Sequence, residues 1–164
     1  MDNTQMDQEP EPRPTARAIL VDPQRRILMM HFRFPSGVEF WATPGGALEG
    51  DETHEAALIR ELEEECGLSG LTPQAEVWTR EHIFQLHGKW FRQQERFYFF
   101  EVEPFELSPT FDEAALAAEG IVGYRWWSIH EMRASGEDFA PRRLADLLED
   151  LLRELPSAPI DAGI

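Results

Sequence analysis

Residues 46–68, GALEGDETHEAALIRELEEECGL, constrain the fold and the chemistry of this chain more than any other stretch. Their apolar residues recur with the period of a helix. Three carboxylates, Glu61, Glu64 and Glu65, are spaced so that they share one face of that helix. Like charges at this spacing repel one another. Because oxygen-only ligands suit a hard cation, we expect the acidic face to bind Mg²⁺ or Mn²⁺.

The helix in this stretch is expected to span residues 53–66. Thr53 is a suitable N-cap residue, and Gly67 suits the position just after a helix end. A second arc of the helix is apolar and is expected to face the core: Leu58, Ile59, Leu62 and Cys66. The helix therefore has an apolar back and an acidic front.

The composition indicates one domain with a single core. The chain has 164 residues, of which 42% are hydrophobic. Its 31 acidic residues outnumber its 15 Lys and Arg residues, and the formal net charge is −16. Such a surface repels nucleic acid and anionic membranes, so we expect neither as a partner. An anionic small molecule would need a metal ion or local arginines to reverse this field.

Cysteine usage and the two ends of the chain indicate a compartment and the domain limits. Cys66 is the only cysteine, which excludes an intrachain disulfide and fits a reducing, cytoplasmic setting. No apolar run approaches the roughly 20 residues that span a bilayer. Residues 1–14 are acidic and proline-rich and lack the apolar core of a signal peptide, so we expect a disordered tail. We expect residues 15–156 to form the domain and residues 157–164 a loose C-terminal tail.

Strands are expected both before and after the acidic helix. Short runs of apolar residues, several of them alternating with polar ones, predict strands at residues 16–21, 27–34, 40–42, 75–86, 90–102 and 122–127. The sequence His87-Gly88-Lys89 fits a hairpin turn between the two longest of these strands.

Two further helices are expected near the C-terminus. Ser128 and Glu131 match a capping box, which would open a short helix. A leucine stripe from Leu144 to Leu155, followed by Pro156, predicts the last helix. Residues 104–119 are expected to be mostly loop, in which a helical turn could form. This mixed order of elements indicates α/β or α+β layers rather than a purely parallel sheet.

The stretch that begins at Gly46 resembles the Nudix box, Gly-x5-Glu-x7-Arg-Glu-apolar-x-Glu-Glu-x-Gly-apolar. Every position of that pattern is matched, by Gly46, Glu52, Arg60, Glu61, Leu62, Glu64, Glu65, Gly67 and Leu68. At typical residue frequencies a chance match at a given start is on the order of 10⁻⁸ to 10⁻⁹. The approach to the box and the flanking strand order are also similar to the Nudix family, over roughly residues 14–155.

The resemblance implies an α/β/α sandwich with a mixed central sheet, in which the box forms a loop–helix–loop. It implies hydrolysis of nucleoside diphosphates linked to another group X, with Mg²⁺ or Mn²⁺ as cofactor and a small nucleotide as substrate. By the same resemblance, the metal ligands are expected to be Glu61, Glu64, Glu65 and the Gly45 carbonyl. Either Glu64 or Glu65 could instead orient water through the metal. Arg60 and Glu52 match positions that brace the loop–helix–loop.

The resemblance leaves the general base open. In several family members it is a glutamate outside the box, on a loop before a late strand. Glu119 matches that place as base or metal ligand, with Glu95 as the second candidate and a glutamate of the box as the third. The identity of X is open as well, since nucleoside triphosphates, ADP-ribose, nucleotide sugars and dinucleoside polyphosphates all fit the box.

Several residues outside the box could contact a nucleotide. The aromatic residues of the long strands are expected to be core residues, although they could stack on a base: Trp78, Phe84, Trp90 and Phe91. Arg33, Arg80 and Arg92 could contact phosphates, or could be ordinary surface residues. The aromatic strands could also pair two copies as a homodimer.

Two alternatives to a hydrolase carry less support from the sequence. One is a Nudix-fold nucleotide sensor or interaction module without turnover, which the intact box disfavours. The other is an isomerase of the isopentenyl diphosphate type, which needs a dedicated cysteine. Cys66 lies on the apolar side of the box helix, where we expect it to be a small core residue.

Overall fold

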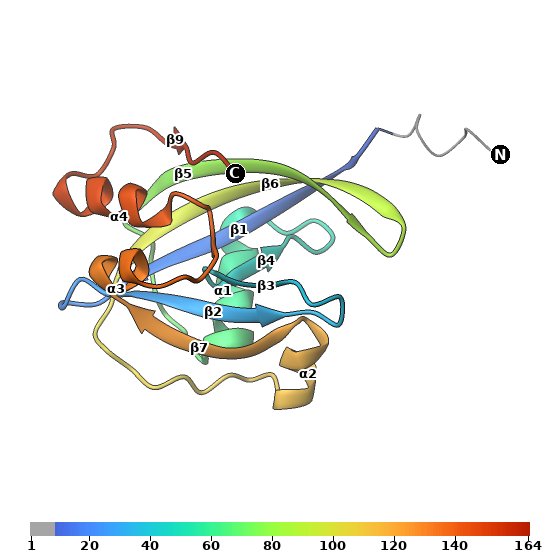
Figure 1. The fold of residues 1–164 in the computed structure, drawn as a ribbon, viewed down its shortest axis with the longest axis horizontal. Coiled ribbons are helices and arrows are strands. Elements are labelled where there is room, and N and C mark those ends of the chain that lie inside the picture. Colours follow the sequence, from blue (N-terminus) through green and yellow to red (C-terminus); the bar gives the residue numbers. More distant parts are fainter. Residues whose placement is uncertain (1–8) are drawn as a thin grey trace.

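The computed structural model describes residues 9–164 of the chain (Figure 1). Strands precede and follow the acidic helix, and further helices lie toward the C-terminus, as the sequence predicts. In chain order they are β1 (Glu11–Val21), β2 (Ile27–Arg33), β3 (Glu39–Ala42), β4 (Gly45–Ala47), α1 (His54–Cys66), β5 (Ala75–Leu86), β6 (Lys89–Glu101), α2 (Glu113–Ala118), β7 (Ile121–Trp127), α3 (Ile129–Ala134), β8 (Phe139–Ala140), α4 (Leu144–Arg153) and β9 (Ile160–Asp161).

A curled mixed sheet forms the centre of the molecule, in the order β8-β3-β2-β1-β6-β5-β9, with β4 paired to β1 and β7 paired to β2. Strand β1 runs parallel to β6 and antiparallel to β2 and β4. Helix α1 covers one face of the sheet, and α3 and α4 cover the other (Figure 1). This three-layer arrangement confirms the predicted α/β/α sandwich.

Each face of the sheet has its own hydrophobic core. On one side, in the α4-side core, Ile19, Met29 and Phe97 pack with the buried leucines of α4. On the other side, Leu20 and Leu28 of the sheet pack with buried residues of α1. Within β1, β2 and β6 the two cores take alternate residues, as the two-residue period of a strand requires. The sheet therefore fixes which side chains of β1 face α1 and which face α4.

The turns and caps that the sequence predicts are present. His87 and Gly88 both have positive φ values, 51° and 77°, and join β5 to β6 in the predicted hairpin. Ser128 and Glu131 form the capping box of α3. Two side chains in the predicted apolar stripes face solvent instead: Ile59 is 50% exposed, and Leu155 lies beyond the end of α4 and is 40% exposed.

The prediction that residues 1–14 form a disordered tail is wrong for the end of that segment, because β1 begins at Glu11. Residues 1–8 lie outside the described part of the chain. The carbonyl of Pro14 accepts a hydrogen bond from the Leu48 N–H, so even-numbered residues of β1 direct their backbone polar groups away from β6. Pro12 and Pro14 therefore remove no donor from the parallel ladder with β6.

The prediction of a loose tail at residues 157–164 is also wrong in part. Strand β9 pairs parallel to β5, and the Ala162 N–H donates to the Thr79 carbonyl over 2.7 Å. Ala162 itself is only 2% exposed and packs in the α4-side core. The strand forms because β5 leaves an edge that a short segment of chain can cover. No helix among residues 9–164 is long and apolar enough to cross a membrane.

Candidate metal centre

Helix α1 holds the acidic residues of the predicted site in a fixed orientation. Its first turn is capped by Thr53, whose side-chain oxygen accepts from the Ala56 N–H over 3.1 Å. Its last turn ends at Gly67, which has a left-handed φ of 74°. Leu58 and Leu62 bury the opposite side of the helix against the sheet. The acidic side is thereby turned toward β4 and away from the core.

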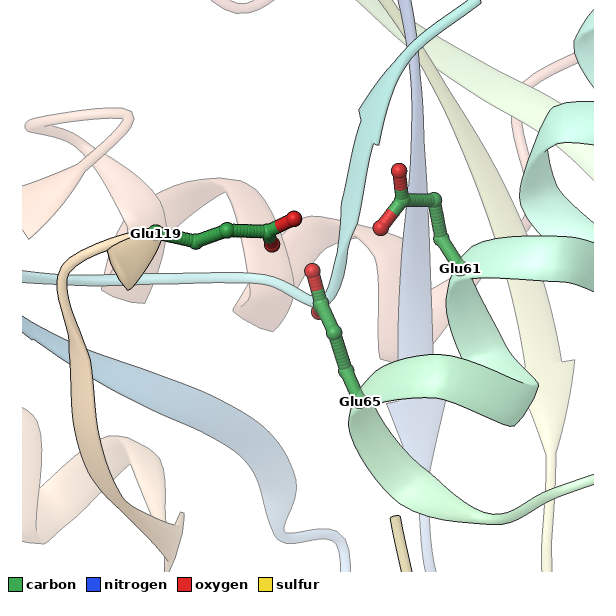
Figure 2. A group of neighbouring side chains, drawn as sticks. All are labelled: Glu61, Glu65 and Glu119. Carbon is green, nitrogen blue, oxygen red and sulfur yellow. The ribbon is translucent and has the colours of Figure 1, made fainter. Parts of the chain in front are cut away.

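Three glutamates converge beside α1: Glu61, Glu65 and Glu119 (Figure 2). One carboxylate oxygen from each lies within 4.8 Å of the other two. Glu61 and Glu65 come from α1, whereas Glu119 reaches toward them from the segment between α2 and β7. Glu61 and Glu65 are buried and Glu119 is exposed, so the cluster has a closed base and an open mouth.

Two consecutive glycines of β4 allow the carboxylates to approach the backbone. The Gly45 N–H donates to Oε2 of Glu65 over 3.2 Å. A Cβ atom on Gly46 would lie 2.4 Å from Oε1 of Glu61, which is closer than such atoms can approach. A side chain at either position would therefore displace a carboxylate or the backbone. The glycine pair is needed for this contact as well as for the turn.

Arg60 connects the loop before α1 to the helix. Its guanidinium donates to both carboxylate oxygens of Glu52, each over 2.9 Å, and to the Ala47 carbonyl over 3.1 Å. It also donates to Oε1 of Glu61 over 2.8 Å. Bidentate bonds of this kind fix both distance and orientation. These contacts join the loop, β4 and α1 at one guanidinium group.

Two predicted ligands, Glu64 and Gly45, lie beside the cluster and bind other groups. One oxygen of Glu64 accepts from Arg60 over 3.2 Å, and Glu64 is not among the three converging residues. The Gly45 carbonyl accepts from Nη1 of Arg17 over 3.2 Å. A carbonyl oxygen has two lone pairs, so this bond leaves one for a second partner.

The electrostatics of the cluster favour a bound cation. Burial, and then the charge of Glu61, raise the pKa of Glu65 well above its ordinary range. The same two causes raise the pKa values of Glu64 and Glu119. These carboxylates therefore disfavour one another's ionised forms in the absence of a positive charge. A divalent cation between them would remove that cost.

One buried oxygen provides a separate test of the fit to a metal. Oε2 of Glu61 is buried and has no hydrogen-bond partner among residues 9–164. A buried carboxylate oxygen without a partner is costly. A hard cation would satisfy this oxygen, and the donor set consists of carboxylate oxygens that suit Mg²⁺ or Mn²⁺. The residues present therefore fit such an ion.

Glu95, the second candidate for the base, lies outside this cluster. It is 4% exposed, and its two oxygens bind Nε of Arg17, over 2.7 Å, and Nη1 of Arg80. Although burial alone would raise it, these two guanidinium groups lower the pKa of Glu95. Arg17 is not among the residues that the sequence motifs indicate. The available signal was one arginine inside the otherwise apolar strand at residues 16–21.

The remaining candidates are aromatic residues and arginines. Trp78 is a core residue, whereas Trp90 is exposed and Phe84 stacks on Phe91 near the hairpin tip. The pairs Arg33–Glu39 and Arg92–Glu81 lie on the surface. Cys66 is buried, and burial raises the pKa of its thiol.

Comparison with known proteins identifies the family of the chain. A family model described as "NUDIX domain" matches residues 11–149, which include β1, the acidic helix and Glu119. The chain belongs to the NUDIX domain family. The Nudix fold is found again in solved structures. A MutT protein from Methanosarcina mazei Go1 matches with a TM-score of 0.65 and 17% identity, covering 90% of this chain and 97% of its own. A MutT NUDIX hydrolase from Burkholderia pseudomallei matches with a TM-score of 0.62 and 23% identity, covering 85% and 97%.

Two curated relatives match over shorter segments. An "8-oxo-dGTP diphosphatase" from Proteus vulgaris is 62% identical over 29 residues, which are 18% of this chain. An "RNA pyrophosphohydrolase" from Saccharophagus degradans is 45% identical over 56 residues, which are 34% of this chain. The matches span only 26% and 32% of the length of those relatives.

Proposed function

We propose that this Nudix protein hydrolyses a pyrophosphate bond in a nucleoside diphosphate linked to a group X, with Mg²⁺ or Mn²⁺ as cofactor. The observation that carries the proposal is the buried oxygen of Glu61 that has no hydrogen-bond partner in the described part of the chain, within the converging cluster of Glu61, Glu65 and Glu119. The names of both curated relatives, a diphosphatase and a pyrophosphohydrolase, support this reaction class.

In this proposal the carboxylates of the box hold the cation and set its position. Glu61 and Glu65 supply buried oxygens from α1, and Glu64 and the Gly45 carbonyl lie beside them as further candidates. A bound divalent cation neutralises phosphate oxygens and lowers the pKa of a bound water. Arg60 and Glu52 keep the loop and helix in register, because their bonds cross between those two segments.

Glu119 is the residue we propose as general base or as an additional ligand. Its carboxylate is exposed, so it can reach a water that attacks phosphorus. Partial desolvation, followed by the charges of Glu61 and Glu64, raises the pKa of Glu119, and a carboxylate with a raised pKa is a stronger base. Glu95 is a weaker candidate, because its pKa is lowered and both of its oxygens bind arginines.

A substrate panel tests the proposed reaction. Nucleoside triphosphates, ADP-ribose, nucleotide sugars and dinucleoside polyphosphates are incubated with and without Mg²⁺, and phosphate products are measured. We expect Mg²⁺-dependent cleavage of at least one substrate. Glu64→Gln and Glu65→Gln are expected to lose roughly 10²-fold or more in kcat, because each removes a carboxylate within or beside the cluster that holds the cation. Glu63→Gln is the matched control, since Glu63 lies on the same helix and is exposed.

Two outcomes of the panel would count against the proposal. Full activity of both variants on every cleaved substrate would show that the box carboxylates are misassigned. Tight nucleotide binding with no hydrolysis at saturating metal would instead indicate a sensor. For any cleaved substrate, hydrolysis in ¹⁸O-labelled water then identifies the attacked phosphorus, because the label appears in only one product.

A further inference from the structure

The face of the sheet that carries the α4-side core continues beyond that core as a polar surface. Cross-strand partners share a face, so the register defines its rows. One row contains Thr15, Glu95 and Arg80, and the next contains Arg13, Gln93 and His82. Arg17 lies on the same face, one row nearer the core. We call these seven residues the basic face.

Positive charge is concentrated on the basic face. It carries three guanidinium groups and one carboxylate, that of Glu95, which pairs with Arg17 and Arg80, in a chain whose net charge is −16. Arg17 and Arg80 are both committed to Glu95, although Nε of the buried Arg80 side chain has no partner among residues 9–164. The basic face is therefore a positively charged region on a protein of negative net charge, and it would attract an anion.

Arg13 is the arginine of this face that is free to bind an anion. Among residues 9–164 no carboxylate lies within ion-pair distance of it. Its Nη1 donates to Oε1 of Gln93 over 3.0 Å, and its guanidinium lies 5.7 and 5.9 Å from the ring centroids of Phe84 and Phe91. Gln93 and the two rings fix its position, and they leave its charge without a counter-ion.

The basic face is continuous with the metal centre. Nη1 of Arg17 donates to the carbonyls of Thr43 and Gly45, the residues that lead into the box. Burial and the charge of Arg17 lower the pKa of Arg13, and the charges of Glu61, Glu95 and Glu119 oppose that shift. Along β1, Arg13 is three residues, or roughly 10 Å, from the residue that pairs with Gly46.

We propose that Arg13 binds a phosphate of the substrate beyond the two that flank the cleaved bond, so that the preferred substrate carries at least three phosphates in a row. This inference rests on the proposed function, since it takes the acidic cluster as the place of cleavage. A guanidinium matches phosphate geometry with two parallel hydrogen bonds. A substrate whose X group is neutral, such as the terminal ribose of ADP-ribose, would leave Arg13 without a partner.

Binding measurements test this assignment without relying on turnover. Calorimetry with Mg²⁺ compares two non-hydrolysable nucleoside triphosphate analogues, one bridged by methylene between α and β and one between β and γ, with ADP-ribose. The variants are Arg13→Gln, Arg13→Lys and the control Arg96→Gln. Arg96 lies on the opposite face of β6, three residues from Gln93, and its removal changes the net charge equally.

The expected result is selective for the number of phosphates. Arg13→Gln raises the Kd of the triphosphate analogues about 10- to 100-fold, as expected for loss of a charged hydrogen bond. Arg13→Lys retains part of the affinity, which also shows that the site is folded. Arg96→Gln stays within about twofold of wild type, and ADP-ribose binding changes by less than about threefold in every variant.

Two results would overturn the inference. One is an Arg13→Gln variant that binds the triphosphate analogues as tightly as Arg96→Gln does. The other is an equal loss of affinity for ADP-ribose. These outcomes differ from failure of the proposed function. If wild type cleaves nothing but Arg13→Gln selectively loses triphosphate binding, the hydrolase assignment fails and the phosphate contact stands.

Discussion

Replacement of Gly46 by alanine tests whether the close approach of Glu61 to β4 matters for the metal centre. The added Cβ would lie 2.4 Å from Oε1 and 2.7 Å from Cδ of Glu61. Because unstrained contacts require about 3.4 Å, the carboxylate must move by about 1 Å. A misplacement of this size costs roughly 10²-fold in rate, which corresponds to about 2.7 kcal/mol in the barrier. We expect kcat and Mg²⁺ affinity to fall together.

The stability of the Gly46→Ala variant should change little, because Gly46 has no left-handed φ and the clash falls on a side chain. Gly123→Ala is the matched control. Gly123 also lies in a strand, and its Cβ would meet nothing within 4 Å. The assays are kcat by phosphate release, Mg²⁺ affinity by calorimetry and unfolding by urea. Wild-type activity and Mg²⁺ affinity in Gly46→Ala would refute the reasoning.

Two further predictions concern stability, both measured by urea unfolding. Because burial and Glu61 raise the pKa of Glu65 above 4.5, the folded state holds a proton that the unfolded chain releases, and stability contributed by this group falls as pH rises. In EDTA, the free energy of unfolding of wild type should therefore fall relative to that of Glu65→Gln between pH 4.5 and neutrality. Mg²⁺ should abolish this fall. A difference between the two proteins that does not change with pH in EDTA would contradict the prediction. Gly67→Ala places a Cβ 1.9 Å from the Ser108 carbonyl oxygen at a φ of 74°, so a clash adds to the backbone strain and the loss should reach about 3 kcal/mol or more. Gly50→Ala, at φ 54° with nothing within 4 Å, should cost only about 1–2 kcal/mol of backbone strain, and equal losses would exclude the clash as the cause.

The sequence was sufficient to predict the elements whose signals are local. Thr53 and Gly67 mark the ends of α1 through their capping chemistry, and the spacing of Glu61 and Glu65 places both carboxylates on one side of the helix. The hairpin at His87 and Gly88 and the capping box at Ser128 are equally local patterns. Each of these predictions depends on residues within a few positions of one another.

Features that depend on distant segments were not predictable in the same way. Pro12 and Pro14 indicated disorder, and only the pairing of β1 with β6 shows that their missing N–H groups face away from the ladder. The pairing of β9 with β5 depends on an edge that no local pattern reveals. The position of Arg13 relative to Gly46 depends on the pairing of β1 with β4.

The position of a bound metal tests the central claim most directly. Mn²⁺ can replace Mg²⁺ at such a site and can be located by anomalous diffraction in crystals of the wild-type protein. We predict an anomalous peak about 2.1 Å from carboxylate oxygens of Glu61 and Glu65, with Oε2 of Glu61 as one ligand. A peak elsewhere on the acidic surface, with none between Glu61 and Glu65, would contradict the assignment of this cluster as the metal centre.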